Sequence, residues 1–235
     1  MHAILTMRAF FVFISLIGSL TLAKAQSHEI GVFLGGSNYV GDIGRTNYIY
    51  PNKFAGGIVY KYNLNPRIAL RGNYNYLPIS GDNRNAENPF RQTPNNIVRR
   101  FTNTIHEFAA GVEFNFYEYN ISDYRTTFTP YILAQFAAIN YKSPVRFISP
   151  NSIELANRFS FAIPLGIGIK GRLDDNLAFA LESSARITFV DDLDYTTTKI
   201  PIINNVGNGN DWYFFTGLSI VYTFGRPPCY NGLTD

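Results

Sequence analysis

The side chains that most often carry catalysis are scarce in this sequence. Only two histidines, His28 and His106, follow the N-terminal leader described below, and neither has a serine and an acid spaced around it as a nucleophile–base pair would require. Both lie near the end of an expected strand, where an interfacial imidazole is the more common role. The sequence therefore predicts that the protein is not an enzyme and has no catalytic or cofactor-binding residue.

Acidic and amide side chains gather near the C-terminus and offer oxygen ligands. Asp191, Asp192 and Asp194 lie in one short stretch, and further amides and Asp211 follow in the segment 208–211. Divalent cations such as Ca²⁺ prefer oxygen ligands. The stretch lacks the spacing of any defined calcium loop, so a solvated, turn-rich loop is the alternative and no metal site is predicted.

Cys229 is the only cysteine of the chain. A lone thiol in an exported protein is either free or paired with another chain. It follows Pro227 and Pro228, which stiffen the C-terminal tail. Docking of this tail onto the folded domain and contact with a separate partner are both compatible with the sequence.

The N-terminus has the features of a secretory signal peptide. Arg8 precedes an uncharged apolar run over 9–22, and Ala23-Lys24-Ala25 gives a small-residue cleavage site. The run is short for a membrane-spanning helix, which needs roughly 20 residues. We expect a signal peptide over 1–25 and one domain over 26–235, with a retained anchor helix as the alternative.

Composition narrows the class of the mature chain. Removing Arg8 and Lys24 from 20 basic residues leaves 18 against 17 acidic ones, so no basic face is available for a nucleic acid. Phe and Tyr number 20 and 16, and nothing after Leu22 is apolar for long enough to form a membrane helix. An exported soluble β-protein and an outer-membrane barrel remain.

Apolar and polar residues alternate with a period of two along the mature sequence, which is typical of strands. In the segment 67–76, for example, Leu70 and Tyr74 share one face while Arg71 and Asn73 share the other. Stretches of about ten to fourteen residues match a tilted strand that crosses a membrane. The eight expected strands are 29–39, 54–62, 67–76, 108–116, 129–142, 159–170, 177–189 and 212–224.

Two details of the strands are harder to predict. Between Tyr131 and Asn140 both faces are apolar, so the pattern leaves the lipid-facing register open. The glycine pairs Gly35-Gly36 and Gly56-Gly57 are expected to mark bulges or sharp curvature, which a small closed barrel requires.

The connections alternate strictly between long and short. Outer-membrane barrels have long extracellular loops and short periplasmic turns, and an even strand count brings both ends to the periplasm. The tail 225–235 would then be a short periplasmic segment. The expected long loops are 40–52, 78–101, 143–156 and 191–210, and the expected turns are 63–66, 120–128 and 173–176.

A soluble barrel would show the same alternation with its apolar face inward, so composition must decide between the two. The apolar face is aliphatic and aromatic almost without interruption, and few charges occupy the other face. We therefore predict an all-β, eight-stranded antiparallel outer-membrane β-barrel whose narrow interior is filled by paired charges. The predicted interior charges are Lys61, Arg67, Arg71, Glu107, Glu113, Lys170, Glu182 and Arg186. The predicted interfacial aromatics are Tyr60, Tyr62, Phe114, Phe116, Tyr222 and Phe224 at one end and Tyr74, Tyr76 and Trp212 at the other.

Seven segments resemble the PorG-like outer-membrane component of the type IX secretion system of Bacteroidetes. The most specific is the last, Tyr-Thr-Phe-Gly-Arg-Pro-Pro-Cys-Tyr over 222–230, and the likeness covers about Glu29 to Tyr230. The resemblance implies a barrel in outer-membrane lipid that anchors or organises the periplasmic ring of a lipoprotein and its partner subunit. It implies no small-molecule substrate. The other six segments are 38–43, 70–74, 113–116, 164–170, 173–177 and 210–213.

On this topology only the short turns and the tail could reach a periplasmic ring. The predicted partner contacts are Tyr119, Asp123, Tyr124, Arg125, Arg226 and Cys229. The alternative function is a free-standing surface barrel that binds ligands or host molecules through its extracellular loops. Mutations in the turns or tail should impair a ring anchor, whereas mutations in the extracellular loops should impair a ligand-binding barrel, so the sensitive end of the barrel distinguishes the two functions.

Overall fold

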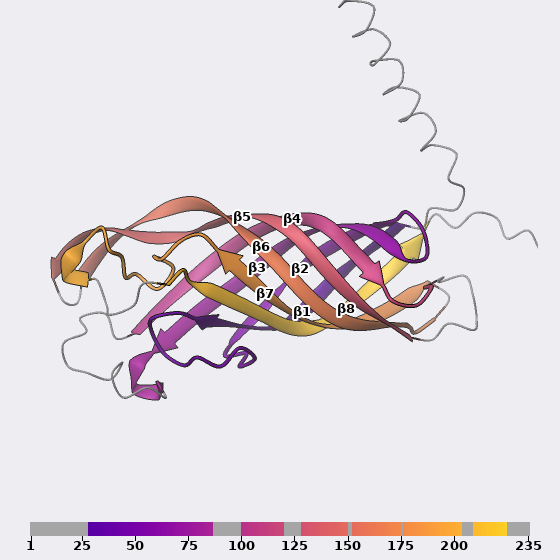
Figure 1. Ribbon diagram of the computed structural model, residues 1–235, viewed down its shortest axis with the longest axis horizontal. Coiled ribbons are helices and arrows are strands. Elements are labelled where there is room, and N and C mark those ends of the chain that lie inside the picture. The colour runs from indigo at the N-terminus through magenta and orange to yellow at the C-terminus, as the bar shows by residue number, and fades with distance from the viewer. Residues whose placement is uncertain are drawn as a thin grey trace, which may run out of the picture.

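The computed structural model describes residues 28–86, 100–119, 128–149, 152–174, 176–203 and 209–224. Eight antiparallel strands close into one barrel (Figure 1). The described helices are the short 3-10 turns η1 (Asn83–Asn85) and η3 (Pro201–Ile203), and no described helix is long and apolar enough to cross a membrane. The strands are β1 (His28–Val40), β2 (Lys53–Asn63), β3 (Ile68–Asp82), β4 (Arg100–Asn115), β5 (Phe128–Ser149), β6 (Ser152–Arg172), β7 (Leu177–Thr188) and β8 (Trp212–Phe224).

Each strand pairs with its neighbours in sequence, and β1 closes the barrel against β8. His28 lies opposite Phe224 at one end of this seam, and Val40 lies opposite Trp212 at the other. The first and last strands therefore begin and end at the same end of the barrel, which also carries the short connections (Figure 1). The predicted fold class, an eight-stranded antiparallel outer-membrane barrel, is confirmed.

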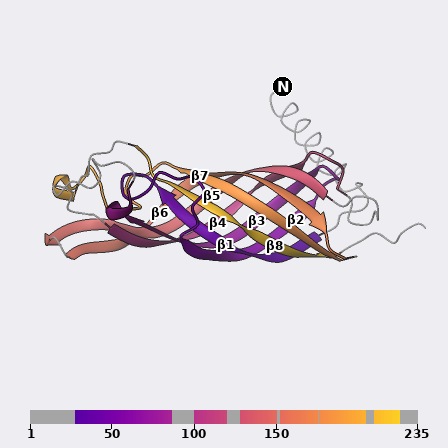
Figure 2. The ribbon, with the colours of Figure 1, turned by 90° about the horizontal axis from the view of Figure 1, so that it is seen from below.

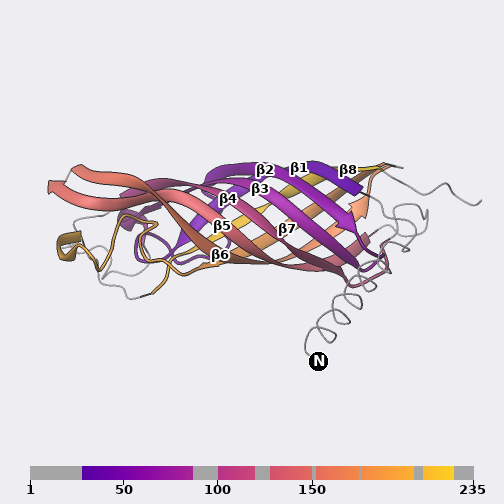
Figure 3. The ribbon, with the colours of Figure 1, turned by 90° about the horizontal axis from the view of Figure 1, so that it is seen from above.

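Several strands extend further than the sequence pattern indicated. The segment 143–156, expected as a long loop, continues the β5–β6 hairpin as far as the pair Ser149 and Ser152, with register shifts after Pro144 and Phe147. This hairpin projects beyond the other strands (Figures 2 and 3). Pro144 led to the prediction of a loop, although the residues after it include β-branched and aromatic side chains, which favour strands. Similarly, β3 continues to Asp82 and β4 begins at Arg100, so the loop between them is shorter than expected.

The expected bulges at the glycine pairs are absent. The β1–β2 register runs without a shift through Gly35-Gly36 and Gly56-Gly57. A Cβ on Gly35 would overlap the backbone of Thr216 on the neighbouring strand. These glycines thus permit close packing between adjacent strands rather than an extra residue in one of them.

The register of β5 is resolved in the structure. Tyr131, Leu133 and Gln135 are buried, whereas Ile132 and Phe136 are exposed. The Gln135 side chain donates a hydrogen bond to Asn73 Oδ1 at 2.7 Å, which satisfies its polar group inside the barrel. The flanking alanines suit either face, which is why the pattern alone was ambiguous.

A belt of apolar side chains surrounds the barrel on its outer face. Phe54 and Phe159 are 71% and 78% exposed, and every strand contributes large apolar residues to this surface. An exposed apolar surface of this extent is incompatible with water and is the expected contact with lipid. The exposed charges of the described strands, by contrast, lie toward the long-loop end. They are Arg100, Lys142, Arg146 and Glu154.

Rings gather at both ends of this belt. At the end with the short turns, His28 accepts or donates a hydrogen bond with the Tyr60 hydroxyl at 2.7 Å and stacks against Phe224. Toward the other end, His106 lies 2.8 Å from the Tyr74 hydroxyl and contacts the Tyr76 ring. Both histidines are therefore part of the aromatic girdles, where a polar tip faces the interface and the ring faces lipid.

Candidate functional site

The interior of the barrel is occupied by a balanced set of buried charges. Four carboxylates and four cations point inward from the strands, and each is less than 8% exposed. Burial of an ionised side chain is unfavourable unless it is paired and hydrogen-bonded. The eight residues are Glu29, Glu107, Glu113, Glu182, Lys61, Arg71, Lys170 and Arg186.

Glu113 of β4 is the centre of this network. Its carboxylate lies 2.8 Å from Lys61 Nζ, 2.5 Å from Lys170 Nζ and 3.4 Å from Arg71 Nη1. The three cations come from β2, β6 and β3, so one side chain ties together distant parts of the wall. Charge-assisted hydrogen bonds of this length are among the stronger polar interactions in a protein.

The network continues toward the long-loop end. Arg71 Nη1 also contacts Glu182 Oε2 at 2.6 Å, and the Tyr131 hydroxyl donates to the same oxygen at 2.9 Å. Further along, Arg186 Nε lies 3.5 Å from Glu107 Oε2. The same oxygen accepts a hydrogen bond from the Tyr213 hydroxyl at 2.5 Å. Side chains from opposite walls therefore meet across the barrel axis and fill it, as an eight-stranded barrel requires.

One predicted interior charge was wrong and one was missed. Arg67 lies in the turn before β3, where its side chain is half exposed and forms an exposed pair with Glu118 at 3.5 Å. Its place in the alternating pattern pointed inward, but the strand begins one residue later. Glu29 takes its place in the interior, 4.0 Å from Lys61 and hydrogen-bonded to Asn63.

A second polar cluster lies at the long-loop end and contains the predicted acidic stretch. The Tyr39 hydroxyl lies 2.9 Å from Asp194 Oδ2 and also contacts Asp211 Oδ1. One hydroxyl has a single proton and cannot donate to two carboxylates at once. Both contacts can be hydrogen bonds only when Asp194 and Asp211 share one proton between them, so that one carboxyl group is neutral.

Burial supports this shared proton. It raises the pKa of Asp194 to about 6 and that of Asp211 well above its usual value, and the negative charge of Asp194 adds to the second shift. Burial, reinforced by Asp42, also raises the pKa of Asp191 to about 6. Burial is the main cause of all three shifts, and the neighbouring carboxylates add to it.

The acidic cluster is not arranged as a metal centre within the described residues. No group of three or more acidic, histidine or cysteine side chains there is positioned to hold an ion. Asp192 instead accepts from Tyr141 and Ser143 at 2.6 and 2.7 Å and pairs with Arg158. The expected cation ligand at position 208 lies outside the described residues.

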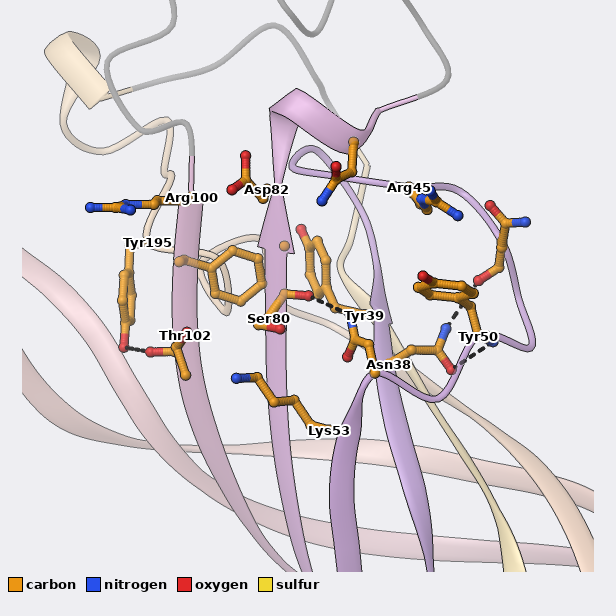
Figure 4. Close-up of a pocket in the computed structure, with 15 residues that line it drawn as sticks. Asn38, Tyr39, Arg45, Tyr50, Lys53, Ser80, Asp82, Arg100, Thr102 and Tyr195 are labelled. Carbon is orange, nitrogen blue, oxygen red and sulfur yellow. Dashed lines mark hydrogen bonds between the residues drawn. The ribbon is translucent and has the colours of Figure 1, made fainter.

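A cavity of about 470 Å³ opens at the rim where β2 begins (Figure 4). Lys53 lies at its base, Arg45 and Tyr50 lie toward one end, and Arg100 and Tyr195 lie toward the other (Figure 4). The sequence did not reveal this site, because its lining comes from four strands, the turn η1 and two loops that are far apart along the chain. No local spacing marks such a combination.

The predicted partner contacts fall mostly outside the described residues. That holds for Asp123, Tyr124, Arg125, Arg226 and Cys229, as it does for the expected signal peptide and the tail. Tyr119 is described, and its side chain is only 6% exposed. Its ring lies 4.6 Å from Lys170 Nζ. This cation–π contact holds the side chain against the interior network, so it does not project from the turn.

A closed barrel with an apolar outer belt and a charge-filled interior defines a small outer-membrane β-barrel protein. Within that class, the chain belongs to the family described as "Domain of unknown function (DUF6089)", whose model matches residues 7–232. No curated protein matches the sequence.

Several solved structures are similar to this chain. Ail, the attachment invasion locus protein of Yersinia pestis, in complex with the heparin analogue sucrose octasulfate, is 13% identical, with 85% of this chain and 99% of that chain covered and a TM-score of 0.47. The N-terminal barrel domain of Pseudomonas aeruginosa OprF is also 13% identical, with 86% and 100% covered and a TM-score of 0.47. Neisserial surface protein A is 11% identical, with 85% and 96% covered and a TM-score of 0.42.

Proposed function

We propose that this protein is a non-enzymatic, non-conducting outer-membrane component of the type IX secretion system, which anchors or organises the periplasmic lipoprotein ring. The short-turn end of the barrel would face the periplasm, with both chain ends on that side. The observation that carries the proposal is where the resembling segments meet. Arg71, Glu113 and Lys170 come from three of those segments and form the centre of the interior network.

A second meeting point supports the same assignment. Tyr39 and Asp211 belong to two other resembling segments and are joined by a hydrogen bond at the long-loop end. Segments that are distant in sequence thus form contacts that hold the barrel together. The resembling segments therefore include residues of the interior network and of the polar cluster at the long-loop end, which supports the proposal beyond an alternation that any barrel strand would share.

The filled interior also argues for an anchoring role over a transport role. Among the described residues, the interior carboxylates Glu113, Glu182 and Glu107 contact cations or hydroxyl groups, and side chains fill the interior of an eight-stranded barrel, which supports a structural role for them. The two ends of the barrel are then the working surfaces. Anchoring a periplasmic ring would use the end with the short turns.

The test is affinity isolation of the tagged protein from detergent-solubilised outer membranes, with partners identified by mass spectrometry. We expect the ring lipoprotein and its partner subunit to be recovered with the full chain and lost from a variant that ends after Phe224. A matched variant with the β5–β6 hairpin shortened at 145–153 should still recover them. A barrel isolated alone, under conditions that keep the ring intact, would refute the anchoring role.

The rim cavity favours a second candidate function, that of a surface barrel which binds a ligand at its long-loop end. In that case shortening the loops would abolish function while removal of the tail would be tolerated. The two candidates place the essential surface at opposite ends of the barrel. Because the hairpin at 145–153 does not line the rim cavity, a variant with the loop 41–52 shortened is compared with the variant that ends after Phe224, and this pair distinguishes the two candidates.

A further inference from the structure

The rim cavity exists because β2 begins at Lys53, further from the long-loop end of the barrel than the adjacent ends of β1 and β3. On the long-loop side of Lys53, β1 and β3 approach each other directly. There the Ser37 hydroxyl donates a hydrogen bond to the carbonyl of Pro78. The loop 41–52 folds over this gap. The resulting cavity has a volume of about 470 Å³, within the range of small-ligand pockets.

The charge of the cavity favours an anion. Three cations line it, Arg45, Lys53 and Arg100, against one carboxylate, Asp82. That carboxylate is already engaged, because Arg84 contacts it through Nη2 at 2.6 Å and Nε at 3.1 Å. None of the three cations forms an ion pair with another described residue. Arginine and lysine so placed are suited to a phosphate, sulfate or carboxylate group.

Rings and amides complete the lining. The rings of Tyr50 and Tyr195 line the cavity, with the Arg45 guanidinium over one face of Tyr50 at 4.7 Å. Asn47, Asn52 and Asn85 present amides, each of which can both donate and accept hydrogen bonds. Sugar rings have apolar C–H faces that pack on aromatic rings and a rim of hydroxyl groups that amides recognise. The combination of rings, amides and cations is thus the chemistry of a charged sugar.

The lining is held in place by the protein itself. The Asn38 amide donates to the carbonyls of Asn47 and Tyr48 at 3.0 and 3.3 Å, which fixes the loop over the cavity. Tyr195 has a positive φ of 69°, unusual for a residue with a side chain, and its hydroxyl donates to the Thr102 carbonyl at 2.7 Å. A prearranged site loses less entropy on binding.

We propose that the rim cavity binds an anionic saccharide, a sugar that carries phosphate, sulfate or carboxylate groups. Arg100 and Lys53 contact the anionic groups, and Tyr50 and Tyr195 pack against the sugar rings. The cavity accommodates about one or two rings. Such a ligand could come from the phosphorylated sugars of a membrane glycolipid or from a soluble polysaccharide. The proposal does not depend on the anchoring role.

The experiment is titration calorimetry of the full chain, folded in detergent micelles, with two pairs of probes. One pair is a sulfated disaccharide and its unsulfated form. The other is a phosphorylated oligosaccharide released from a lipopolysaccharide core, and its dephosphorylated form. We expect both anionic probes to bind and both neutral forms to bind at least tenfold more weakly. The tighter of the two anionic probes identifies the source, glycolipid or soluble polysaccharide.

Variants locate the binding. Arg100→Gln should weaken the anionic probes about tenfold, which corresponds to loss of one charge-assisted contact, and Tyr50→Ala should weaken them as well. Arg146→Gln, which removes an exposed cation on the projecting hairpin outside the cavity, is the matched control and should leave affinity within twofold. Heat-modifiable electrophoretic mobility verifies that each variant is folded.

Three results would overturn the proposal. They are equal weakening by Arg146→Gln and Arg100→Gln, equal binding of the neutral sugars, and binding of inorganic sulfate or phosphate as tight as that of the saccharides. The first would indicate unspecific attraction to a basic surface. Equal binding of the neutral sugars would show that the anionic group is not recognised. Equally tight binding of inorganic sulfate or phosphate would show that the sugar ring is not recognised.

Discussion

At the scale of single residues, the interior of the barrel is governed by the cost of burying charge. Eight buried charges sum to zero, and Glu113 alone compensates three cations. Removal of one partner from a buried network leaves the others uncompensated, which costs far more than the pair itself contributes. Glu113 is therefore the residue whose loss should matter most.

The first prediction follows. Glu113→Gln keeps the shape of the side chain but leaves Lys61, Lys170 and Arg71 without their shared carboxylate. We expect it to lower the free energy of unfolding by about 3–5 kcal/mol, measured by urea unfolding in lipid vesicles. Glu118→Gln is the matched control, because its pair with Arg67 is exposed and screened by water. Equal stability of the two variants would contradict a central role for Glu113.

The sequence predicted seven of the interior charges from alternation alone, since inward and outward residues differ by one position. It failed at Arg67 and Glu29, and both failures lie at strand ends. A period-two pattern reports the face on which a residue lies only while the strand continues. Where a strand begins depends on the turn and on the neighbouring strand, which the pattern does not contain.

At the scale of strands and loops, close packing at the seam between β1 and β8 restricts what the wall can hold. A Cβ on Gly35 would overlap the backbone of Thr216 and Gly217, whereas a Cβ on Gly72 meets no atom nearer than 4.0 Å. We expect Gly35→Ala to reduce the yield of folded barrel severalfold and Gly72→Ala to leave it unchanged. The measurement is the folded fraction by electrophoretic mobility without heating. Similar yields would show that the seam can widen without penalty.

The loop that begins after β7 is expected to respond to pH. Because the folded-state pKa of Asp194 and of Asp191 is raised to about 6, their contribution to loop stability is complete below about pH 4 and is lost as pH rises through 6. Above that pH, Asp194 and Asp191 carry negative charges that are withdrawn from water, which is unfavourable. We therefore predict weaker hydrogen-exchange protection of 191–203 at pH 8 than at pH 5, after correction for intrinsic exchange.

Asp194→Asn tests the cause of this pH effect. The amide is neutral at both values, so the difference in protection between pH 5 and pH 8 should shrink strongly in this variant. A control, Glu154→Gln, changes an exposed carboxylate on the projecting hairpin and should keep the wild-type difference. Protection that is unchanged with pH in the unmodified protein would refute the shared proton.

Expected loops and turns were predicted less well than strands. The β5–β6 hairpin was mistaken for a loop because Pro144 interrupts it, although its partner residues pair to Ser149 and Ser152. The rim cavity, in turn, depends on where β2 begins relative to β1 and β3. Such differences in strand length arise from packing in three dimensions and leave little trace in local composition.

At the scale of the whole molecule, the apolar belt defines where the membrane lies. Leu218 is at the middle of β8, faces outward and is 57% exposed, and it lies opposite Leu34 and Leu181 on the adjacent strands. Its position midway along the strand places it near the centre of the bilayer. Ile148 is similarly exposed, at 62%, but lies on the projecting hairpin beyond the belt.

The last prediction compares these two positions. An arginine at the midplane of a barrel's lipid face costs about 2–4 kcal/mol, and this cost falls toward zero at the interface. Leu218→Arg should therefore destabilise the barrel by about that amount in urea unfolding from lipid vesicles, whereas Ile148→Arg should have little effect. The comparison must be made in lipid vesicles, because the predicted cost is that of placing an arginine in the hydrocarbon of the bilayer. If the two substitutions cost the same, the apolar belt does not mark the membrane, and the exposed leucines and phenylalanines must instead be covered by another protein.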